Sequence, residues 1–586
     1  MQDIKEVSTI KKLWKYFKGY KTLLVLGPVF KLIEAILELF IPLIVAKIID
    51  VGIKNNDGDY VIKMGVLMLV FGAVGLIFAL LCQYFAAKVA YGFGCGLRRG
   101  LFAHIMTLSG KEVSEVGTQT LVTRMTSDIT QVQNGVNMFI RLAVRAPFLT
   151  IGSVIMAFTI NFEIAIYFLL AVFLISLVLY FVMHKSIPQF KNIQQSQDII
   201  SRKTSENLGG ARVIRAFVRQ KEQVESFEEQ GDILAEKIVK VSKYSNALNP
   251  LTYAIANIAI IVIVWLGAKA VNGGMLANGD ILALVSYMTQ TMLSLVVFAN
   301  TIVLFNKAIA SVTRITSVLN LESAVDEGNV QKENENVQNS IEFKNVTFAY
   351  NENAAAAIND VSFCVKNGQT LGIIGGTGCG KSTLVQLVSR AFDCQKGEVI
   401  VMGENVKNYS FKTLKNMLGV VPQTSVLLKG TVRENICFGN ENATDEEIFT
   451  ALKTAQGYEI LQKMPDGLAS QVAEGGKNLS GGQKQRFAIA RAIVKKPKIL
   501  ILDDSASALD YATDAALRTA LKTDCKNMTT IIISQRAASI KNADIILVLN
   551  EGKLIDSGTH DELLLKSELY REICVSQNLV KEVAKL

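Results

Sequence analysis

The chain has 586 residues, of which 50% are hydrophobic and only 19% charged, against about 25% charged in an ordinary soluble domain. This composition argues against a wholly soluble protein, and the apolar excess lies mostly between residues 22 and 307. The net charge of +9 does not indicate nucleic-acid binding, because the basic residues gather beside apolar segments, as they do on cytoplasmic membrane flanks.

Residues 1–21 are expected to form a basic amphipathic helix on the inner face of the membrane. Leu13, Trp14 and Phe17 recur at helical spacing among lysines such as Lys11 and Lys15. A secretory signal peptide would need a small-residue cleavage site, which the stretch does not show, and the following apolar stretch is long enough to span a membrane. The interfacial helix is therefore the favoured interpretation.

Six apolar segments follow, each near or above the ~20 residues that a membrane-spanning helix needs. Within a membrane domain of residues 22–320 they cover 22–52, 62–90, 135–160, 162–184, 250–272 and 280–307. The connections at 91–134 and 185–249 are long and basic, whereas the others are short or nearly free of basic residues. Since positive charge marks the cytoplasmic side, both termini and the whole second half are predicted to be cytoplasmic, in a protein of the plasma (inner) membrane.

The first apolar segment contains Lys31, Glu34 and Glu38, at spacings that place them on one face of a helix. Charges inside a span are costly, so Glu34 and Glu38 are candidates to line a polar cavity that receives a cationic substrate. The alternative is that the charges neutralise one another or pair with a neighbouring helix, and the sequence does not separate these two. Arg141 and Arg145, in the third segment, are expected to extend toward the lipid headgroups.

The second half has a different character. Residues 321–340 are polar without an apolar period and are predicted to be a linker, and residues 341–586 alternate strands, helices and charges as an α/β domain does. The first strand of that domain, residues 341–350, alternates apolar and polar residues and ends in Tyr350. The Tyr350 ring could stack on an adenine base, although a terminal tyrosine usually serves only strand packing.

A phosphate-binding loop is the clearest motif of this domain. A strand at 371–374 leads into the pattern GxxxxGK[ST], and a helical run follows from Thr383. Glycine N–H groups can wrap phosphate oxygens, Lys381 can reach the β and γ phosphates, and Ser382 or Thr383 can bind Mg²⁺. The loop consists of Gly375, Gly376, Thr377, Gly378, Cys379, Gly380, Lys381 and Ser382. The sequence therefore predicts binding of a nucleotide, ATP, with Mg²⁺.

Two further motifs belong to the same chemistry. The aliphatic run 499–502 ends in Asp503, as a buried parallel strand does when it delivers an acid to the carboxyl edge of a sheet, so Asp503 is the candidate Mg²⁺ ligand. A second glycine-rich helix start is formed by Ser480, Gly481, Gly482 and Gln483. Because one nucleotide needs only one phosphate cradle, the second cradle implies a dimer in which it closes on nucleotide held by another copy of the domain.

These motifs, in this order and over nearly the whole chain, resemble those of ATP-binding cassette (ABC) exporters. The resemblance implies a half-transporter, with an all-α six-helix transmembrane domain of the type IV exporter kind followed by an α/β P-loop nucleotide-binding domain. It implies that Tyr350 stacks on adenine and that residues 479–483 are the family signature. The resemblance also places Gln423 in the loop that senses the membrane domain, and it implies that Gln423 takes part in catalysis and in Mg²⁺ binding. Residues 507–510 would face the dimer partner, and 212–217 would dock on a cassette.

Two positions depart from the family pattern. The residue after the metal-binding aspartate is usually the glutamate that positions the attacking water, and here it is Asp504, one methylene shorter. The switch histidine is replaced by Gln535, which can hydrogen-bond a phosphate oxygen but cannot carry positive charge. Both changes fall in one half-site while the signature is intact, which resembles the subunit with the slower site in a heterodimeric exporter.

The sequence thus predicts an ATPase that exports a small amphipathic molecule, drug-like, lipid or peptide, by alternating access, as in bacterial multidrug exporters. Its expected partners are a second half-transporter chain, membrane lipids and the transported molecule, without nucleic acid. Glu34 and Glu38 favour cationic amphiphiles. The alternatives are a homodimeric exporter or lipid flippase, and an ATP-gated channel or non-transporting regulatory subunit.

Overall fold

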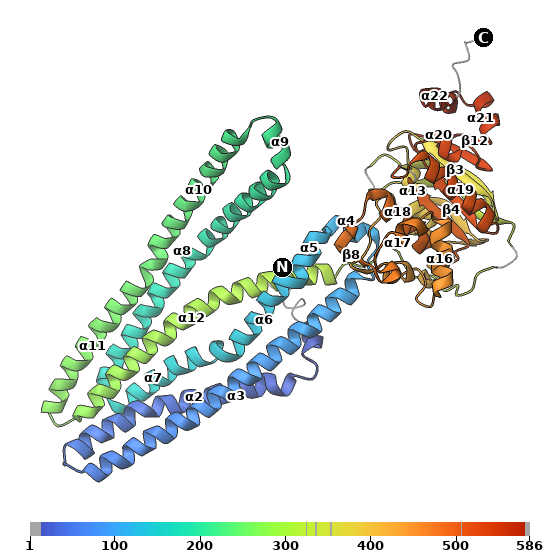
Figure 1. The fold of residues 1–586 in the computed structure, drawn as a ribbon. Helices are drawn as coiled ribbons and strands as arrows, with labels where there is room; N and C mark the ends of the chain where they lie inside the picture. Colours follow the sequence, from blue (N-terminus) through green and yellow to red (C-terminus); the bar gives the residue numbers. More distant parts are fainter. Residues whose placement is uncertain (1–12, 324, 335–336, 352–353, 506, 580–586) are drawn as a thin grey trace. The chain divides into compact units, whose positions relative to one another are not determined.

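The computed structural model describes residues 13–579, apart from 324, 335–336, 352–353 and 506. The chain divides into two compact units, Met1–Met106 with Val116–Leu321, and Thr107–Glu115 with Glu322–Leu586. The first is helical and the second mixes strands with helices (Figure 1). The segment Thr107–Glu115 was expected to be part of a membrane-domain loop, and the structure groups it with the second unit instead.

Among the described residues, the helical unit consists of helices of 6 to 48 residues and three π-helical turns. The helices are α2 (Lys21–Lys47), α3 (Gly58–Ile105), α5 (Thr118–Thr123), α6 (Ile129–Met138), α7 (Arg145–Ile160), α8 (Phe162–Gly209), α9 (Ala211–Ala216), α10 (Gln220–Asn246), α11 (Leu248–Asn272) and α12 (Asn278–Leu319). The π-helical turns are η2 (Ile48–Ile53), η3 (Arg124–Asp128) and η4 (Phe139–Ala143). Figure 1 shows α8 and α10 running side by side, and they are in contact.

Five helical segments of the described chain are long and apolar enough to cross a membrane. They are Gly58–Ile105, Thr118–Ile160, Phe162–Gly209, Gln220–Asn272 and Asn278–Leu319, and they include five of the six predicted spans. The remaining predicted span coincides with α2, a helix of 27 residues that contains Lys31, Glu34 and Glu38. Because α3 and α8 continue far beyond the predicted spans, the long basic connections are largely helical extensions of the spans.

Local caps and small residues explain how these helices begin and pack. The Asn161 side chain accepts a hydrogen bond from the Ile164 N–H at the start of α8, which satisfies an otherwise unpaired donor. In the membrane-domain core, Ala35 of α2 is fully buried, and small residues let helices approach closely. The hydroxyl of Tyr287 in α12 donates to the Leu39 carbonyl at 2.6 Å, which ties α12 to α2.

The amphipathic N-terminal helix predicted for residues 1–21 lies largely outside the described residues. The described part contains a short 3-10 turn, η1 (Trp14–Phe17). Phe17 is buried and stacks on Phe93 of α3, with 4.3 Å between ring centroids. Phe17 therefore packs against α3 of the helical unit.

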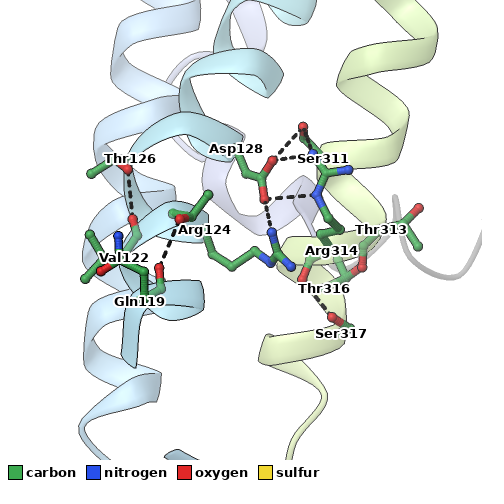
Figure 2. A network of polar contacts seen from close by, with 11 residues as sticks. Gln119, Val122, Arg124, Thr126, Asp128, Ser311, Thr313, Arg314, Thr316 and Ser317 are labelled. Atoms are coloured by element: carbon green, nitrogen blue, oxygen red, sulfur yellow. Dashed lines mark hydrogen bonds and ion pairs between the residues drawn. The ribbon is translucent and has the colours of Figure 1, made fainter. Parts of the chain in front are cut away.

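A buried polar network joins η3 to α12 (Figure 2). The Asp128 carboxylate accepts hydrogen bonds from Arg124 at 2.8 Å, Ser311 at 2.9 Å and the Arg314 Nε at 3.1 Å. The Asp128 side chain is only 4% exposed, so these three donors compensate for its burial. The network holds the two helical segments in one register.

The second unit is built on two sheets. Its strands are β1 (Asn339–Phe348), β2 (Ile358–Lys366), β3 (Thr370–Gly375), β4 (Lys396–Val401), β5 (Glu404–Asn405), β6 (Leu418–Val421), β7 (Gly430–Thr431), β8 (Gln471–Val472), β9 (Ile499–Asp503), β10 (Thr529–Ile533), β11 (Ile545–Asn550) and β12 (Lys553–Gly558). One sheet has the order β2-β1-β4-β5 and the other β12-β11-β3-β10-β9-β6, while β7 and β8 form a separate pair. In the six-stranded sheet only β12 runs antiparallel to its neighbour.

Helices cover this larger sheet and supply its loops. They are α13 (Lys381–Val388), α14 (Phe411–Met417), α15 (Val432–Cys437), α16 (Asp445–Thr454), α17 (Tyr458–Gln462), α18 (Gly481–Ile493), α19 (Tyr511–Asp524), α20 (Ala537–Ile540), α21 (His560–Lys566) and α22 (Glu568–Ser576), with 3-10 turns η5 (Gly467–Ala469) and η6 (Glu474–Gly476). The short helix α4 (Gly110–Val116) belongs to the segment Thr107–Glu115 except for its last residue. The central strands are buried on both faces, as parallel strands between helices are.

The predicted linker is partly attached to the second unit. Val330 pairs with Tyr409, and its N–H donates to the Asn408 carbonyl at 2.8 Å. The Arg390 guanidinium donates to the Asp326 carbonyl at 2.6 Å, and the Val325 side chain is buried. Residues 325–330 of the polar stretch are therefore attached to the second unit, because backbone pairing fixes them without an apolar pattern.

Candidate active site

The register of the parallel strands brings the predicted site residues to one edge of the sheet. β10 lies between β3 and β9, and Asp503 at the end of β9 pairs with Ile533 at the end of β10. β3 leads into the phosphate-binding loop, and β6, on the other side of β9, leads toward Gln423. The carboxyl ends of parallel strands form the crevice where such folds bind ligands.

The loop after β3 has the geometry of a phosphate cradle. Gly378 and Gly380 have positive φ angles of 81° and 100°, which favour glycine. A Cβ on Gly375 would lie 2.2 Å from the Leu549 carbonyl oxygen, and one on Gly380 would lie 2.6 Å from the Ala357 oxygen. Neighbouring backbone therefore leaves room only for glycine at these two positions. The loop ends at the N-terminus of α13, which begins at Lys381.

Lys381 closes this loop. Its ammonium donates hydrogen bonds to the carbonyl oxygens of Gly375 at 2.9 Å and Gly376 at 2.6 Å, and the residue is buried. These carbonyls hold the charge at the centre of the cradle. A phosphate can replace them as the partner of the same ammonium group.

Ser382 and Asp503 form the candidate Mg²⁺ site. The Ser382 hydroxyl donates to an Asp503 carboxylate oxygen at 3.2 Å, which brings two hard oxygen donors together beside the cradle. Mg²⁺ is commonly held by one or two carboxylates together with the phosphates of its substrate, and this pair fits that role. Burial raises the pKa of the Asp503 carboxyl above its ordinary value of 3.8, because the charged form loses its hydration.

Asp504 follows directly and faces the loop after β6. The Gln423 Nε2 donates to an Asp504 carboxylate oxygen at 3.4 Å, and the Asp504 N–H donates to the Ile533 carbonyl at 3.0 Å. Burial raises the pKa of this carboxyl too, against the attraction of Lys381. Gln535, two residues after β10, is exposed. The structure thus places Gln423 and Asp504 together at the sheet edge.

Tyr350 lies two residues after the end of β1, a strand of the other sheet. Its hydroxyl lies 3.0 Å from the Thr383 hydroxyl and 2.8 Å from the Gln386 side-chain oxygen, both on α13. Its ring meets Phe392 edge to face, and 41% of the residue is exposed. The exposed ring next to the cradle helix is available to stack on a base, as the sequence predicts.

The signature begins α18. The Ser480 hydroxyl accepts from the Gln483 N–H, and the Gln483 side chain accepts from the Ser480 N–H, which forms a capping box. A Cβ on Gly482 would lie 2.9 Å from the Ala508 carbonyl oxygen, so the signature packs closely on the loop at 507–510. The remaining signature glycine, Gly481, has open space around it. The motif therefore forms an exposed helix start.

A pair that the motifs did not indicate connects the signature helix to the loop of Gln423. The Ser425 hydroxyl donates to the side-chain oxygen of Gln485 at 2.8 Å, and Gln485 is 3% exposed. No sequence motif marks this pair, because the burial of Gln485 is visible only in the structure. Movement of one of the two elements would disturb the other through this bond.

Comparison with known proteins now decides the family. The ABC transporter transmembrane region family matches residues 24–295, and the ABC transporter family matches residues 358–507. An uncharacterised ABC transporter ATP-binding protein of Bacillus subtilis, YfiB, is 36% identical and aligns over 97% of this chain and 98% of its own. This chain belongs to the ABC transporter family.

Two further similarities describe this ABC half-transporter. The ATP-dependent lipid A-core flippase of Yersinia pestis is 28% identical, over 98% of each chain. The structure of a bacterial Atm1-family ABC exporter with ATP bound has a TM-score of 0.78 and 22% identity, and covers 97% of this chain and 99% of that one. The chain is thus an ATPase and exporter with its helical transmembrane domain fused to an α/β nucleotide-binding cassette, and a multi-pass protein of the inner membrane.

Four charged residues inside this transporter's membrane domain are paired within the chain: Lys31 with Glu34, and Arg145 with Glu38. The Lys31 ammonium lies 2.6 Å from a Glu34 oxygen, and the Arg145 guanidinium donates to Glu38 at 2.8 and 3.1 Å. Both carboxylates therefore have a cation partner, as the pairing alternative expects, and a role of Glu34 and Glu38 in a substrate cavity stays a prediction. The expectation that Arg145 extends toward headgroups is wrong, because Glu38 on α2 attracts it.

Proposed function

We propose that this chain is the slower-hydrolysing half of a heterodimeric ABC exporter, which moves a small amphipathic molecule, drug-like, lipid or peptide, by alternating access. The combination of Asp504 and Gln535 at the carboxyl edge of the sheet carries the proposal. An intact cradle, an intact signature and a shortened acid occur in one chain. Such a chain binds ATP well and hydrolyses it slowly at its own site.

ATP binding uses the cradle. Backbone N–H groups of the loop and the N-terminus of α13 bind the phosphates, and Lys381 exchanges the Gly375 and Gly376 carbonyls for a phosphate oxygen. Mg²⁺, held by Ser382 and Asp503, with Gln423 in reach of the same edge, would neutralise developing negative charge on the phosphates. The Tyr350 ring stacks on adenine.

Hydrolysis at this site is slow for a geometric reason. Asp504 is one methylene shorter than glutamate, so its carboxylate ends further from the attacking water. Misplacement by about 1 Å can cost on the order of a hundredfold in rate. Gln535 can contact the γ-phosphate but adds no positive charge to a transition state that is rich in negative charge.

The signature completes a different site. Ser480 and Gly482 lie at the exposed start of α18 and would close on ATP bound by a partner chain with its own glutamate and histidine.

In the membrane domain, α9 contains no buried residue, and Val213 and Phe217 are 60% and 73% exposed. Such an exposed apolar turn supports docking on a cassette of the dimer. ATP binds the closed dimer more tightly than the open dimer and so shifts the transmembrane domains to an outward-facing arrangement. Hydrolysis returns the dimer to the inward-facing arrangement.

The test compares this chain purified alone with the chain co-expressed with a half-transporter that copurifies with it. We expect the pair to hydrolyse ATP at least about tenfold faster than the chain alone, and Lys381→Ala to weaken ATP binding in both preparations. Equal turnover of the two preparations would contradict the heterodimer. ATP-dependent accumulation of a solute in inverted vesicles separates an exporter from an ATP-gated channel or a regulatory subunit, since neither builds a gradient.

The similarity to a lipid A-core flippase over the full chain favours a second candidate, a homodimeric lipid exporter. In that case the chain alone moves a fluorescent lipid between leaflets in proteoliposomes, and its ATPase activity equals that of the co-expressed preparation. The same purification therefore distinguishes the two candidates.

A further inference from the structure

The residue before Tyr350 is held by a side chain and not by a neighbouring strand. The strand β1 pairs with β2 up to Phe348 and with β4 up to Thr347, so Ala349 lies beyond both ladders. The Ala349 N–H donates to the side-chain oxygen of Gln395 at 2.6 Å, and the Gln395 Nε2 donates to the Ala349 carbonyl at 2.8 Å. The backbone just before the Tyr350 ring is therefore fixed by one glutamine.

The side-chain amide of Gln395 takes the place of a backbone partner. In an antiparallel ladder, a hydrogen-bonded pair of residues exchanges two N–H···O bonds. The amide of Gln395 has both a donor and an acceptor, and it makes the same two bonds with Ala349. The backbone N–H of Gln395 donates to the Thr347 carbonyl at 3.1 Å, which continues the pairing of β4 with β1. Gln395 therefore extends this ladder by one residue, toward Tyr350.

The Tyr350 ring itself is held at two further places. Phe348 and Phe392 meet it edge to face, with 5.0 and 5.3 Å between ring centroids. Its hydroxyl lies 3.0 Å from the Thr383 hydroxyl on α13, the helix that begins at the end of the phosphate-binding loop. Phe392 and Gln395 both lie in the connection that follows α13. These contacts therefore fix the ring relative to the phosphate cradle, while part of it stays exposed.

The position of the ring matters because ATP carries its base and its phosphates on one ribose. When the loop and Lys381 hold the phosphates, the base can reach only a limited region beside the cradle. Ordering a side chain on binding lowers affinity, so a ring that is already held in that region binds the base more tightly than a mobile one. The backbone that carries the Tyr350 ring therefore contributes to nucleotide affinity, although it lies outside the phosphate-binding loop.

We propose that Gln395 is a positioning residue of the ATP site. By holding the backbone of Ala349, it places the Tyr350 ring where the adenine of a nucleotide bound in the cradle stacks on it. Gln395 acts through Tyr350 and takes no part in hydrolysis. The inference rests on the stacking of Tyr350 on adenine, which is part of the proposed function. It adds to the ATP site a residue that none of the sequence motifs contains.

The experiment measures binding of ADP with Mg²⁺ to the full chain, purified alone in lipid nanodiscs, by titration calorimetry. Gln395→Met removes the donor and the acceptor at similar length, Tyr350→Ala removes the ring, and a double variant combines the two changes. Gln369→Met is the matched control. The Gln369 side-chain oxygen also accepts from a backbone N–H, that of Lys366 at 2.9 Å, but Lys366 pairs with Asn339 at the opposite end of β1.

We expect Tyr350→Ala to raise the Kd of ADP about tenfold, because stacking on an aromatic ring contributes strongly to the binding of a base. Gln395→Met should raise the Kd about fivefold, and Gln369→Met should leave it unchanged. The double variant should bind ADP as Tyr350→Ala does, because Gln395 acts through the ring. A merely structural role of Gln395 would instead multiply its loss with that of Tyr350→Ala.

Three outcomes would overturn the positioning role alone. They are an unchanged Kd in Gln395→Met, an equal loss in Gln369→Met, and a double variant that shows the product of the two single losses. If Tyr350→Ala binds ADP as the unaltered chain does, adenine stacking fails and the positioning role fails with it. Because ADP binding is measured on the chain alone, the result does not depend on whether the exporter is a heterodimer, which the turnover of the two preparations decides.

Discussion

The side-chain amide of Gln423 donates to a carboxylate oxygen of Asp504 across 3.4 Å, which joins the loop after β6 to the end of β9. Asp504 itself has a φ of +46°, a left-handed conformation that is uncommon outside glycine. Strained backbone of this kind gathers at functional sites, where the surrounding structure holds it in place. The short acid is therefore held in a defined position, and its reach is set by its length.

Restoring the family residues tests whether these two side chains limit hydrolysis. The double change Asp504→Glu with Gln535→His should raise the ATPase rate of the chain alone by about tenfold to a hundredfold, because the longer carboxylate reaches the water and the imidazole reaches the γ-phosphate. Steady-state phosphate release measures it. The change Asp504→Asn with Gln535→His, which lacks a base, is the control. An unchanged rate in the glutamate variant would show that the limit lies elsewhere.

The cradle predicts opposite outcomes for two glycines of one loop. Gly380→Ala should abolish detectable ATP binding and lower stability by about 2 kcal/mol, since its φ is 100° and the new Cβ meets the Ala357 oxygen at 2.6 Å. Gly376→Ala should be tolerated, because a Cβ there has no neighbour within 4 Å. Binding of a fluorescent ATP analogue and thermal unfolding of the full chain measure both. Similar losses in the two variants would refute this account of the loop.

The raised pKa of the Asp503 carboxyl predicts that the stability of the nucleotide-free chain depends on pH. Burial raises the pKa of Asp503 above 3.8, so the folded state favours its protonated form. That stabilising preference is complete below pH 3.8 and is lost as pH rises through the folded pKa. Asp503→Asn should therefore raise the unfolding temperature of the nucleotide-free chain at pH 7, with a gain that disappears toward pH 4, and should abolish the stabilisation by Mg²⁺ and ATP.

A carboxylate with the opposite shift is the control. Hydrogen bonds from Thr513 lower the pKa of Asp510, so its charged form is the favoured one. Asp510→Asn should give no gain in unfolding temperature at pH 7. A gain equal to that of Asp503→Asn would mean that general charge reduction, and not burial at the site, explains the result.

The polar network of Figure 2 predicts that a substitution in the helical unit, outside the unit that holds the ATP site, strongly lowers the stability of the chain. Asp128→Asn leaves the guanidinium groups of Arg124 and Arg314 without their anion. It should lower the free energy of unfolding by about 3 kcal/mol. This value is the lower end of the range for broken buried ion pairs, because the Arg314 side chain is 44% exposed. Thermal unfolding in nanodiscs measures it. Thr126→Val, whose exposed hydroxyl only bonds the Val122 carbonyl, should change little. Equal shifts would rule out a specific role for the network.

Short motifs explain why the cassette site could be predicted from the sequence. The residues of the cradle are contiguous, and Asp503 ends a run of buried strand residues, so local pattern and strand order place them at one edge. The backbone strain at Asp504 carries no such pattern. The bond between Ser425 and Gln485 joins positions 60 apart and has no motif of its own.

The ion pair between Glu38 and Arg145 in the membrane domain could not be predicted from the sequence, because the two residues are far apart along the chain. Glu38 and Arg145 are 107 positions apart, and their contact depends on how α2 and α7 pack, which hydropathy does not determine. Length and hydropathy, by contrast, placed five of the six predicted spans on helices that are long and apolar enough to cross a membrane, because each must cross the same apolar layer.

The grouping of Thr107–Glu115 with the cassette has a mechanical consequence. The chain passes between the two compact units three times, at 106–107, at 115–116 and at 321–322. A protease cut near residues 320–322 would therefore leave the cassette attached, because Ser109 and Lys111 line a cavity with Val325, Phe348 and Tyr350. The cassette is connected to the membrane helices in two ways. One is the covalent link at its N-terminus, and the other is the segment Thr107–Glu115, which packs within the cassette unit.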